Sequence, residues 1–122
     1  CGRLFEGTPD AMWQSMLVLR QLPPETMVHC GHEYTLANLR FAQHLEPLND
    51  AIRIRIASVE ERRNQSLPTV PAPLEIELKT NPFLRADDPQ LIQSISDRFD
   101  ENLSPGAATF TFIRSLKDTF KS

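Results

Sequence analysis

Apolar residues recur at helical spacing over most of the chain, and this pattern predicts a mostly helical protein. The first helix begins at Thr8 and Pro9, an N-cap residue followed by a proline suited to the first helical position. It ends before Pro23, because proline does not continue a helix. Its spacing predicts one core-facing stripe, which consists of Met12, Trp13, Met16, Leu17, Leu19 and Leu22.

A short apolar run at residues 27–30 predicts a strand, and Gly31 and His32 follow it. Gly31 permits a sharp turn, so His32 lies at the carboxyl end of the strand, where ligands gather in open α/β sheets. A second helix is predicted over residues 33–46. Its buried stripe is Tyr34, Ala37, Phe41 and Leu45, with Asn38 in the same arc. The polar groups on this stripe indicate that part of it lines a wet site.

After Pro47 the pattern predicts helices only, so we place a domain boundary between residues 46 and 49. Asn49 or Asp50 caps a third helix, which carries Ile52, Ile56 and Val59. An extended proline-containing connection follows, with a short helix at residues 74–78 and a turn at Asn81-Pro82-Phe83. Asp88-Pro89 and Ser104-Pro105 open two more helices. Their apolar stripes are Leu91, Ile92, Ile95 and Phe99, and then Ala108, Phe112, Ile113, Leu116 and Phe120.

The last helix also carries two cations on one side. At 100° per residue, Arg114 and Lys117 fall outside the apolar stripe and about 60° apart. A guanidinium fork beside an ammonium group suits the carboxylates of a small anionic ligand. Taken alone, such a pair also fits an ordinary solvated helix face.

Composition limits the classes of protein that fit. The chain has 122 residues, 40% of them hydrophobic and 24% charged, with a net charge of −3. These values suit a soluble globular domain, or the second half of a larger one, and give no reason to expect nucleic acid. No apolar run is long enough for a membrane span. Cys1 and Cys30 lack metal-finger spacing and suit a reducing cytosol. The start at Cys1-Gly2 suggests a cut through a larger domain.

Five motifs together carry a family resemblance. They are Cys-Gly-Arg-Leu-Phe-Glu-Gly at residues 1–7, Cys-Gly-His-Glu-Tyr-Thr at 30–35, Pro-Thr-Val-Pro at 68–71, Asn-Pro-Phe at 81–83 and Arg-Ser-Leu-Lys at 114–117. With these motifs in this order, the chain resembles the carboxyl-terminal half of the glyoxalase II family. These are the hydroxyacylglutathione hydrolases of the metallo-β-lactamase superfamily. The resemblance implies an α/β fold class, in which residues 1–46 complete an αββα sandwich. Residues 47–122 would then form an all-α, glutathione-binding domain.

The resemblance also implies an activity and cofactors. The family hydrolyses the thioester S-D-lactoylglutathione to D-lactate and glutathione with two divalent metals, usually zinc, with iron or manganese as variants. Such metals supply hydroxide near neutral pH and stabilise the oxyanion of the attacked carbonyl. The family pattern makes His32 a metal ligand and puts the other ligands upstream of this chain. We therefore expect the isolated chain to be inactive, and the full-length protein to be cytoplasmic and monomeric.

More of the family's glutathione-binding residues than of its metal ligands have counterparts in this chain. By resemblance they are Arg3, Phe5, Tyr34, Asn38, Arg114 and Lys117. Many family members have tyrosine where this chain has Phe5. Loss of that hydroxyl removes one possible hydrogen bond to the peptide, about 0.5–1.5 kcal/mol.

Other interpretations stay open at this point. Without the resemblance, His32 fits a helix-start or core histidine, since one histidine is not a metal site. Cys30 fits a buried small apolar group. The whole chain could be a non-catalytic module that binds glutathione-like peptides, or part of a persulfide dioxygenase that keeps the fold and uses one iron. The basic pair at Arg114 and Lys117 favours the hydrolase, because the dioxygenases are usually shorter there.

Overall fold

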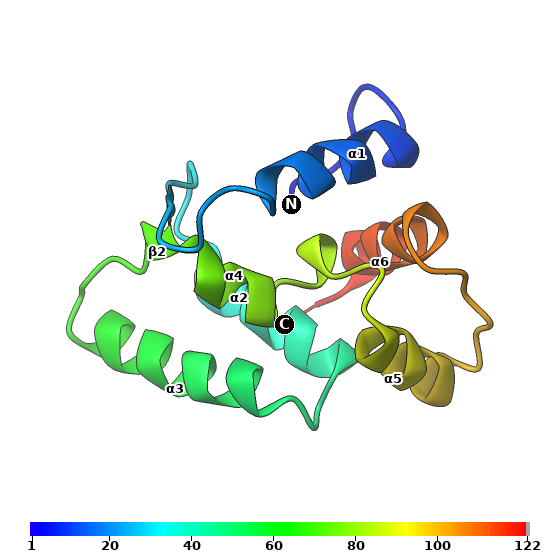
Figure 1. Cartoon of the computed structure of the whole chain (residues 1–122). Coiled ribbons are helices and arrows are strands. Elements are labelled where there is room, and N and C mark those ends of the chain that lie inside the picture. The colour runs from blue at the N-terminus through cyan, green and yellow to red at the C-terminus, as the bar shows by residue number, and fades with distance from the viewer. Residues whose placement is uncertain (122) are drawn as a thin grey trace. The chain divides into compact units, whose positions relative to one another are not determined.

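The computed structural model describes residues 1–121, in which helices predominate. In chain order the elements are α1 (Pro9–Leu19), β1 (Met27–Val28), α2 (Thr35–Leu45), α3 (Asp50–Asn64), β2 (Ala72–Pro73), α4 (Leu74–Thr80), the 3₁₀-helix η1 (Pro82–Leu84), α5 (Pro89–Phe99) and α6 (Ala107–Thr119) (Figure 1). The mostly helical content confirms that part of the fold prediction. Within these residues the structure contains one small sheet and shows no metallo-β-lactamase sandwich.

The described residues divide into two compact units. Unit 1 combines Cys1–Gln21 with Pro82–Lys121, and unit 2 is Leu22–Asn81. The boundary that we placed near residue 46 refers to a sandwich that the described residues do not contain, so it stays a prediction. No helix within residues 1–121 combines the length and apolar character that crossing a bilayer requires.

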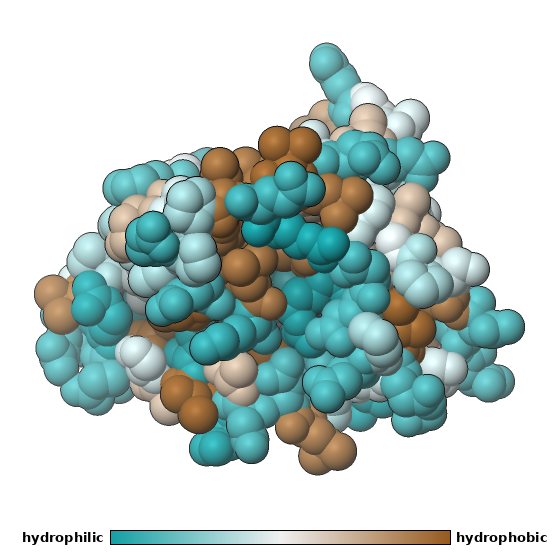
Figure 2. Space-filling view, viewed as in Figure 1, coloured by the Kyte–Doolittle hydropathy of each residue, from teal (hydrophilic) through white to brown (hydrophobic). Residues whose placement is uncertain are grey.

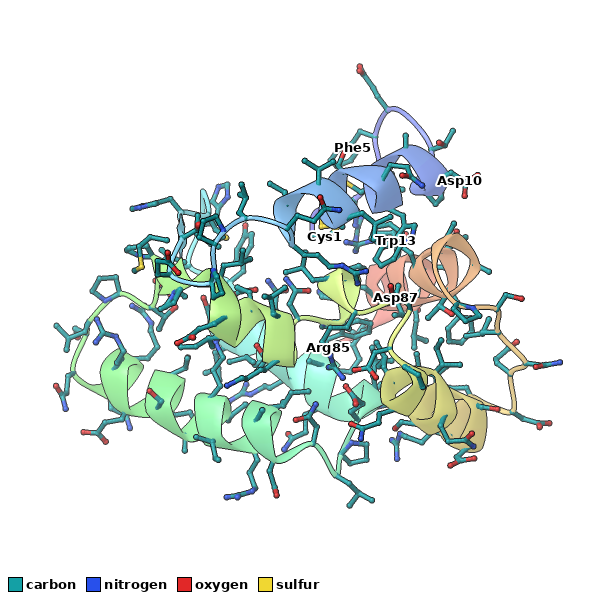
Figure 3. The ribbon with its side chains drawn as sticks, viewed as in Figure 1. Cys1, Phe5, Asp10, Trp13, Arg85 and Asp87 are labelled. Carbon is teal, nitrogen blue, oxygen red and sulfur yellow. The ribbon has the colours of Figure 1, made fainter. Side chains whose placement is uncertain are left out.

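The core of unit 1 is an aromatic cluster between α1, η1 and α6. Phe110 of α6 is fully buried and lies 6.1 Å from the Trp13 ring of α1 and 5.5 Å from the Phe83 ring of η1. Helices α1 and α6 run side by side in Figure 1, with Trp13 labelled on α1 in Figure 3. The sequence analysis left Phe110 out of its stripe, because it set the phase of the last helix from Ala108, which is exposed.

An ion pair beside this cluster joins the end of α1 to the segment between η1 and α5. Arg20 follows the last residue of α1 and donates two hydrogen bonds of 2.7 Å to the two carboxylate oxygens of Asp87. Its guanidinium also donates to the carbonyl of Leu84 at 3.3 Å and lies 5.5 Å from the Trp13 ring centroid. These hydrogen bonds from Arg20 lower the pKa of Asp87 and raise the pKa of Arg20. Figure 3 labels Asp87.

The Arg20–Asp87 pair predicts an acid-dependent loss of stability. A carboxyl whose folded pKa is depressed stabilises the fold above its unfolded pKa, and this contribution is lost as the pH falls through the folded pKa. We expect Asp87→Asn to lower the melting temperature at pH 7, and the gap to wild type to close below about pH 4. Thermal unfolding across pH measures this, with exposed Asp10→Asn as the control for loss of one charge. A gap that stays constant with pH contradicts the prediction.

Unit 2 is built on the packing of α2 against α3. Its core cluster joins the buried residues Leu39, Ala42, Ile52 and Val59, with Leu36 and Ile56 packed against it. The side chain of Asn49 accepts a hydrogen bond from the N–H of Ile52 at 3.3 Å, which confirms Asn49 as the N-cap of α3. Arg55 of α3 then reaches α4, donating to Glu77 at 2.6 Å and to the Thr80 hydroxyl at 2.7 Å. This pair ties the predicted short helix to α3.

The strand of unit 2 is shorter than predicted. Strand β1 pairs antiparallel with β2, with Met27 opposite Pro73 and Val28 opposite Ala72. If this register continued, His29 would lie opposite Pro71, which lacks the N–H that a ladder needs, so the pairing stops before residue 29. The strand prediction is therefore wrong for residues 29–30. Cys30 is exposed, which also corrects its expected burial.

The predicted apolar stripes are only partly buried. Trp13 is the buried residue of α1, whereas Leu19 is 47% exposed and Leu22, beyond the helix end, is 44% exposed. In α2, Phe41 and Leu45 are buried as predicted, but Tyr34 precedes the helix and is 60% exposed. Figure 2 shows apolar side chains between hydrophilic ones on the molecular surface. Helical spacing identified the helices better than it identified their inner faces.

Candidate functional site

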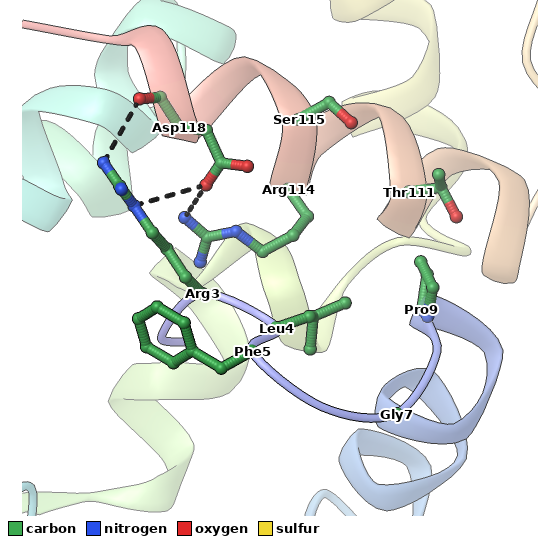
Figure 4. Close-up of a pocket in the computed structure, with 9 residues that line it drawn as sticks. All are labelled: Arg3, Leu4, Phe5, Gly7, Pro9, Thr111, Arg114, Ser115 and Asp118. Atoms are coloured by element: carbon green, nitrogen blue, oxygen red, sulfur yellow. Dashed lines mark hydrogen bonds and ion pairs between the residues drawn. The ribbon is translucent and has the colours of Figure 1, made fainter.

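A hollow of about 370 Å³ lies in unit 1, between the segment that precedes α1 and the outer side of α6. Its lining residues are Arg3, Leu4, Phe5, Gly7, Pro9, Thr111, Arg114, Ser115 and Asp118 (Figure 4). Sites for small ligands commonly have volumes of about 300–1,000 Å³. Three of the residues that the sequence analysis assigned to a peptide site, Arg3, Phe5 and Arg114, line this hollow.

Arg114 is buried, with 6% of its surface exposed. It donates to the backbone carbonyls of Cys1 and Gly2, the latter at 3.0 Å, and its guanidinium lies 5.1 Å from the Phe83 ring centroid. The alternative that Arg114 belongs to a solvated helix face is therefore wrong, because main-chain oxygens and an aromatic ring cover its charge. Its Nε is buried and has no hydrogen-bond partner among the described residues.

Asp118 joins the two arginines of the hollow. One oxygen of its carboxylate, Oδ1, lies 3.1 Å from Nη2 of Arg114 and 3.8 Å from Nε of Arg3 (Figure 4). Arg3 also donates to the backbone carbonyl of Asp118 at 3.5 Å. The sequence analysis missed Asp118. The available signal was its position four residues after Arg114, where two side chains on one helix are neighbours.

Lys117 adds positive charge near the hollow without lining it. Partial burial lowers the pKa of Lys117, the positive charges of Arg114 and Arg3 lower it further, and Asp118 acts in the opposite direction. The cluster thus contains three basic side chains and one carboxylate. A ligand that brings carboxylates is the chemical class that this excess of positive charge favours.

Phe5 forms an apolar edge of the hollow and is 88% exposed. Figure 3 labels it on the segment that leads into α1. Phenylalanine has no hydroxyl, so Phe5 offers only its ring and its main chain to a ligand. An exposed ring beside guanidinium groups suits a ligand with a short apolar stretch next to its charges.

The remaining predicted site residues lie in unit 2. The rings of His32 and Tyr34 are stacked, with centroids 5.0 Å apart and planes at 10°. Asn38 is exposed on the first turns of α2, and its N–H donates to the carbonyl of Tyr34 at 2.9 Å. The structure thus brings the rings of His32 and Tyr34 together, and Asn38 lies one helical turn after Tyr34. Their relation to the hollow of unit 1 stays a prediction.

His32 alone does not make a metal site. Among residues 1–121 there is no group of three or more histidine, cysteine, aspartate or glutamate side chains that could hold a metal ion. Zinc takes at least three protein ligands in catalytic sites and four in structural sites. The exposed imidazole of His32 can supply one ligand, so the described residues do not fit a complete metal centre.

A family model and individual relatives of this chain indicate the same family. The family described as "Hydroxyacylglutathione hydrolase C-terminus" matches residues 33–120. Over 120 residues, or 98% of this chain, hydroxyacylglutathione hydrolases of Erythrobacter litoralis, Hyphomonas neptunium and Cyanothece sp. are 46%, 47% and 50% identical to it. The matched part is 44–45% of those proteins, so the chain spans about half their length. The chain belongs to the hydroxyacylglutathione hydrolase family, also called glyoxalase II, and corresponds to its carboxyl-terminal part.

Proposed function

We propose that this chain is the carboxyl-terminal part of an enzyme that hydrolyses S-D-lactoylglutathione to D-lactate and glutathione. Its role in that enzyme is to bind the glutathione peptide. The observation that carries the proposal is the hollow in which Arg3 and Arg114 meet, with Lys117 nearby, in a chain of this family. Glutathione carries two carboxylates, which match the excess of positive charge.

The cations of unit 1 have different roles in this proposal. Arg3 is mostly exposed, with a side-chain exposure of 64%, and its long contacts with Asp118, at 3.5 and 3.8 Å, leave guanidinium N–H groups for a peptide carboxylate. Arg114 is held by the main chain and by Asp118, so it supplies a fixed positive charge beneath the site. Lys117 adds a third charge. Tyr34, Asn38 and the ring of Phe5 are proposed to complete the peptide contacts.

His32 is proposed as one ligand of a metal pair, zinc with iron or manganese as variants, whose other ligands lie outside the described residues. Such ions lower the pKa of bound water and polarise a thioester carbonyl. The imidazole of His32 is exposed and therefore accessible for this role. We further propose that the enzyme is a cytoplasmic monomer that acts in the removal of methylglyoxal.

Two other functions remain alternatives. A binding module would use the same cationic hollow for a glutathione-like peptide without catalysis. A persulfide dioxygenase would keep the fold and oxidise glutathione persulfide with one iron. The Arg114–Lys117 pair on α6 favours the hydrolase, because the dioxygenases are usually shorter at that end.

One assay distinguishes the three functions. The native protein that carries this chain is supplied with S-D-lactoylglutathione, and free thiol is measured. In parallel, oxygen consumption is measured with glutathione persulfide. The proposal predicts thiol release without oxygen consumption. Oxygen consumption alone supports the dioxygenase, and glutathione binding without either reaction supports the binding module.

A further inference from the structure

Glu33 lies between the two stacked residues His32 and Tyr34 and connects them to a distant part of unit 2. Its carboxylate accepts two hydrogen bonds from Thr69, one from the backbone N–H to Oε2 at 3.0 Å and one from the hydroxyl to Oε1. Thr69 is 7% exposed. Both donors of this buried residue are therefore directed at one carboxylate, 36 residues earlier in the chain.

The segment that Glu33 holds has little other support. Strand β1 ends at Val28, and α2 begins only at Thr35, with no side-chain hydrogen bond capping it. Residues 29–34 between them are all exposed. Within this segment the turn is closed by one backbone hydrogen bond of 3.0 Å, from the N–H of Tyr34 to the carbonyl of His32. The pair with Thr69 therefore restrains a stretch that packing leaves open.

Thr69 can hold Glu33 because its own loop is fixed. Arg62 of α3 donates to the carbonyl of Pro68 at 2.8 Å, and Arg63 donates to the carbonyl of Leu67 at 3.1 Å. After Thr69 the chain enters β2, which pairs with β1. The positive charges of both arginines also attract the carboxylate of Glu33. The C-terminal end of α3, the loop at residues 67–69 and the carboxylate of Glu33 are thus linked by successive hydrogen bonds.

We propose that Glu33 and Thr69 form a positioning pair that sets the orientation of His32 and Tyr34. The proposal rests on the proposed function, in which His32 binds metal and Tyr34 binds the peptide. A glutamate suits the role because an ionised carboxylate accepts at both oxygens, matching the two donors of Thr69. Glutamine keeps one oxygen for the Thr69 N–H, but its NH₂ group makes the Thr69 hydroxyl accept instead of donate, and the negative charge that faces Arg62 and Arg63 is lost. Neither Glu33 nor Thr69 needs to touch the substrate.

The test uses the native full-length protein and the thioester substrate. We expect Glu33→Gln and Thr69→Val to lower kcat/KM by about 10- to 100-fold, as for misplaced site residues. Thr69→Ser keeps both donors and should restore wild-type kinetics. Asn49→Ala removes the N-cap of α3 in the same unit and is the control for lost stability. It should lower the melting temperature with kcat/KM unchanged.

A second readout does not depend on activity. Hydrogen–deuterium exchange of residues 29–34 should be faster in Glu33→Gln and Thr69→Val, and unchanged in Thr69→Ser and Asn49→Ala. If the thioester is not a substrate, the proposed function fails, while the exchange data still test the pair. Unchanged exchange in both disrupting variants would overturn the proposal. So would an equal loss of kcat/KM in Asn49→Ala.

Discussion

Replacing Arg114 by methionine is expected to raise the KM of the full-length protein for S-D-lactoylglutathione, its proposed substrate, by about 10- to 100-fold. The substitution keeps an unbranched apolar stem but removes the guanidinium and its hydrogen bonds to Gly2 and Asp118. Each charge-assisted hydrogen bond contributes about 1.5–3 kcal/mol, and a factor of ten in affinity is about 1.4 kcal/mol. The segment that carries Arg3 also loses the hydrogen bonds that Arg114 donates to it, so two cations of the hollow are affected at once.

Two variants make the result for Arg114 specific. Arg114→Lys keeps the charge but not the planar fork, so its KM should fall between those of wild type and the methionine variant. Arg98 is an exposed arginine on α5 of the same unit and lines no part of the hollow. Arg98→Met should leave KM unchanged. An Arg114→Met enzyme with wild-type KM would show that the hollow does not bind the peptide.

The largest effect on stability is expected at Phe110. Replacing this buried aromatic side chain by alanine should lower the free energy of unfolding by about 3–5 kcal/mol, from lost apolar burial and the cavity left behind. The ring contacts with Trp13 and Phe83 would be lost together, so α1 and η1 would both lose their packing against α6. Denaturant unfolding followed by tryptophan fluorescence reports this directly, because Trp13 is the one tryptophan of the chain.

A graded series controls the Phe110 experiment. Phe110→Leu keeps most of the apolar volume and should be destabilised much less than the alanine variant. Phe5→Ala removes a ring that is 88% exposed, so its unfolding free energy should stay within about 0.5 kcal/mol of wild type. If Phe110→Ala and Phe5→Ala cost the same, the aromatic cluster is not the core of unit 1.

Local chemistry made several helix starts predictable. Thr8, Asn49 and Asp88 each accept a hydrogen bond from a backbone N–H of the helix that they cap, as the sequence analysis expected. The start of α6 was misjudged. Ser104-Pro105 has the composition of a helix start, but Gly106 is the N-cap, with φ of 94°, a backbone conformation that favours glycine.

Non-local contacts explain what the sequence could not predict. The burial of Arg114 depends on carbonyls of residues 1 and 2, which lie more than 110 residues away in the chain. Glu33 was assigned to the start of a helix, whereas its partner is Thr69. The motifs indicated candidate site residues. They did not indicate which residues touch, because spacing along one element carries no information about a partner from another.

The most direct test of the account compares two thioesters with the native full-length protein. One is S-D-lactoylglutathione, and the other is the same molecule with the glycine carboxylate converted to an amide. If the cluster of Arg3, Arg114 and Lys117 binds the peptide through its carboxylates, kcat/KM should fall about 10- to 100-fold for the amide, the equivalent of one lost charge-assisted hydrogen bond. Equal hydrolysis of the two thioesters, or no hydrolysis of either, would contradict the account.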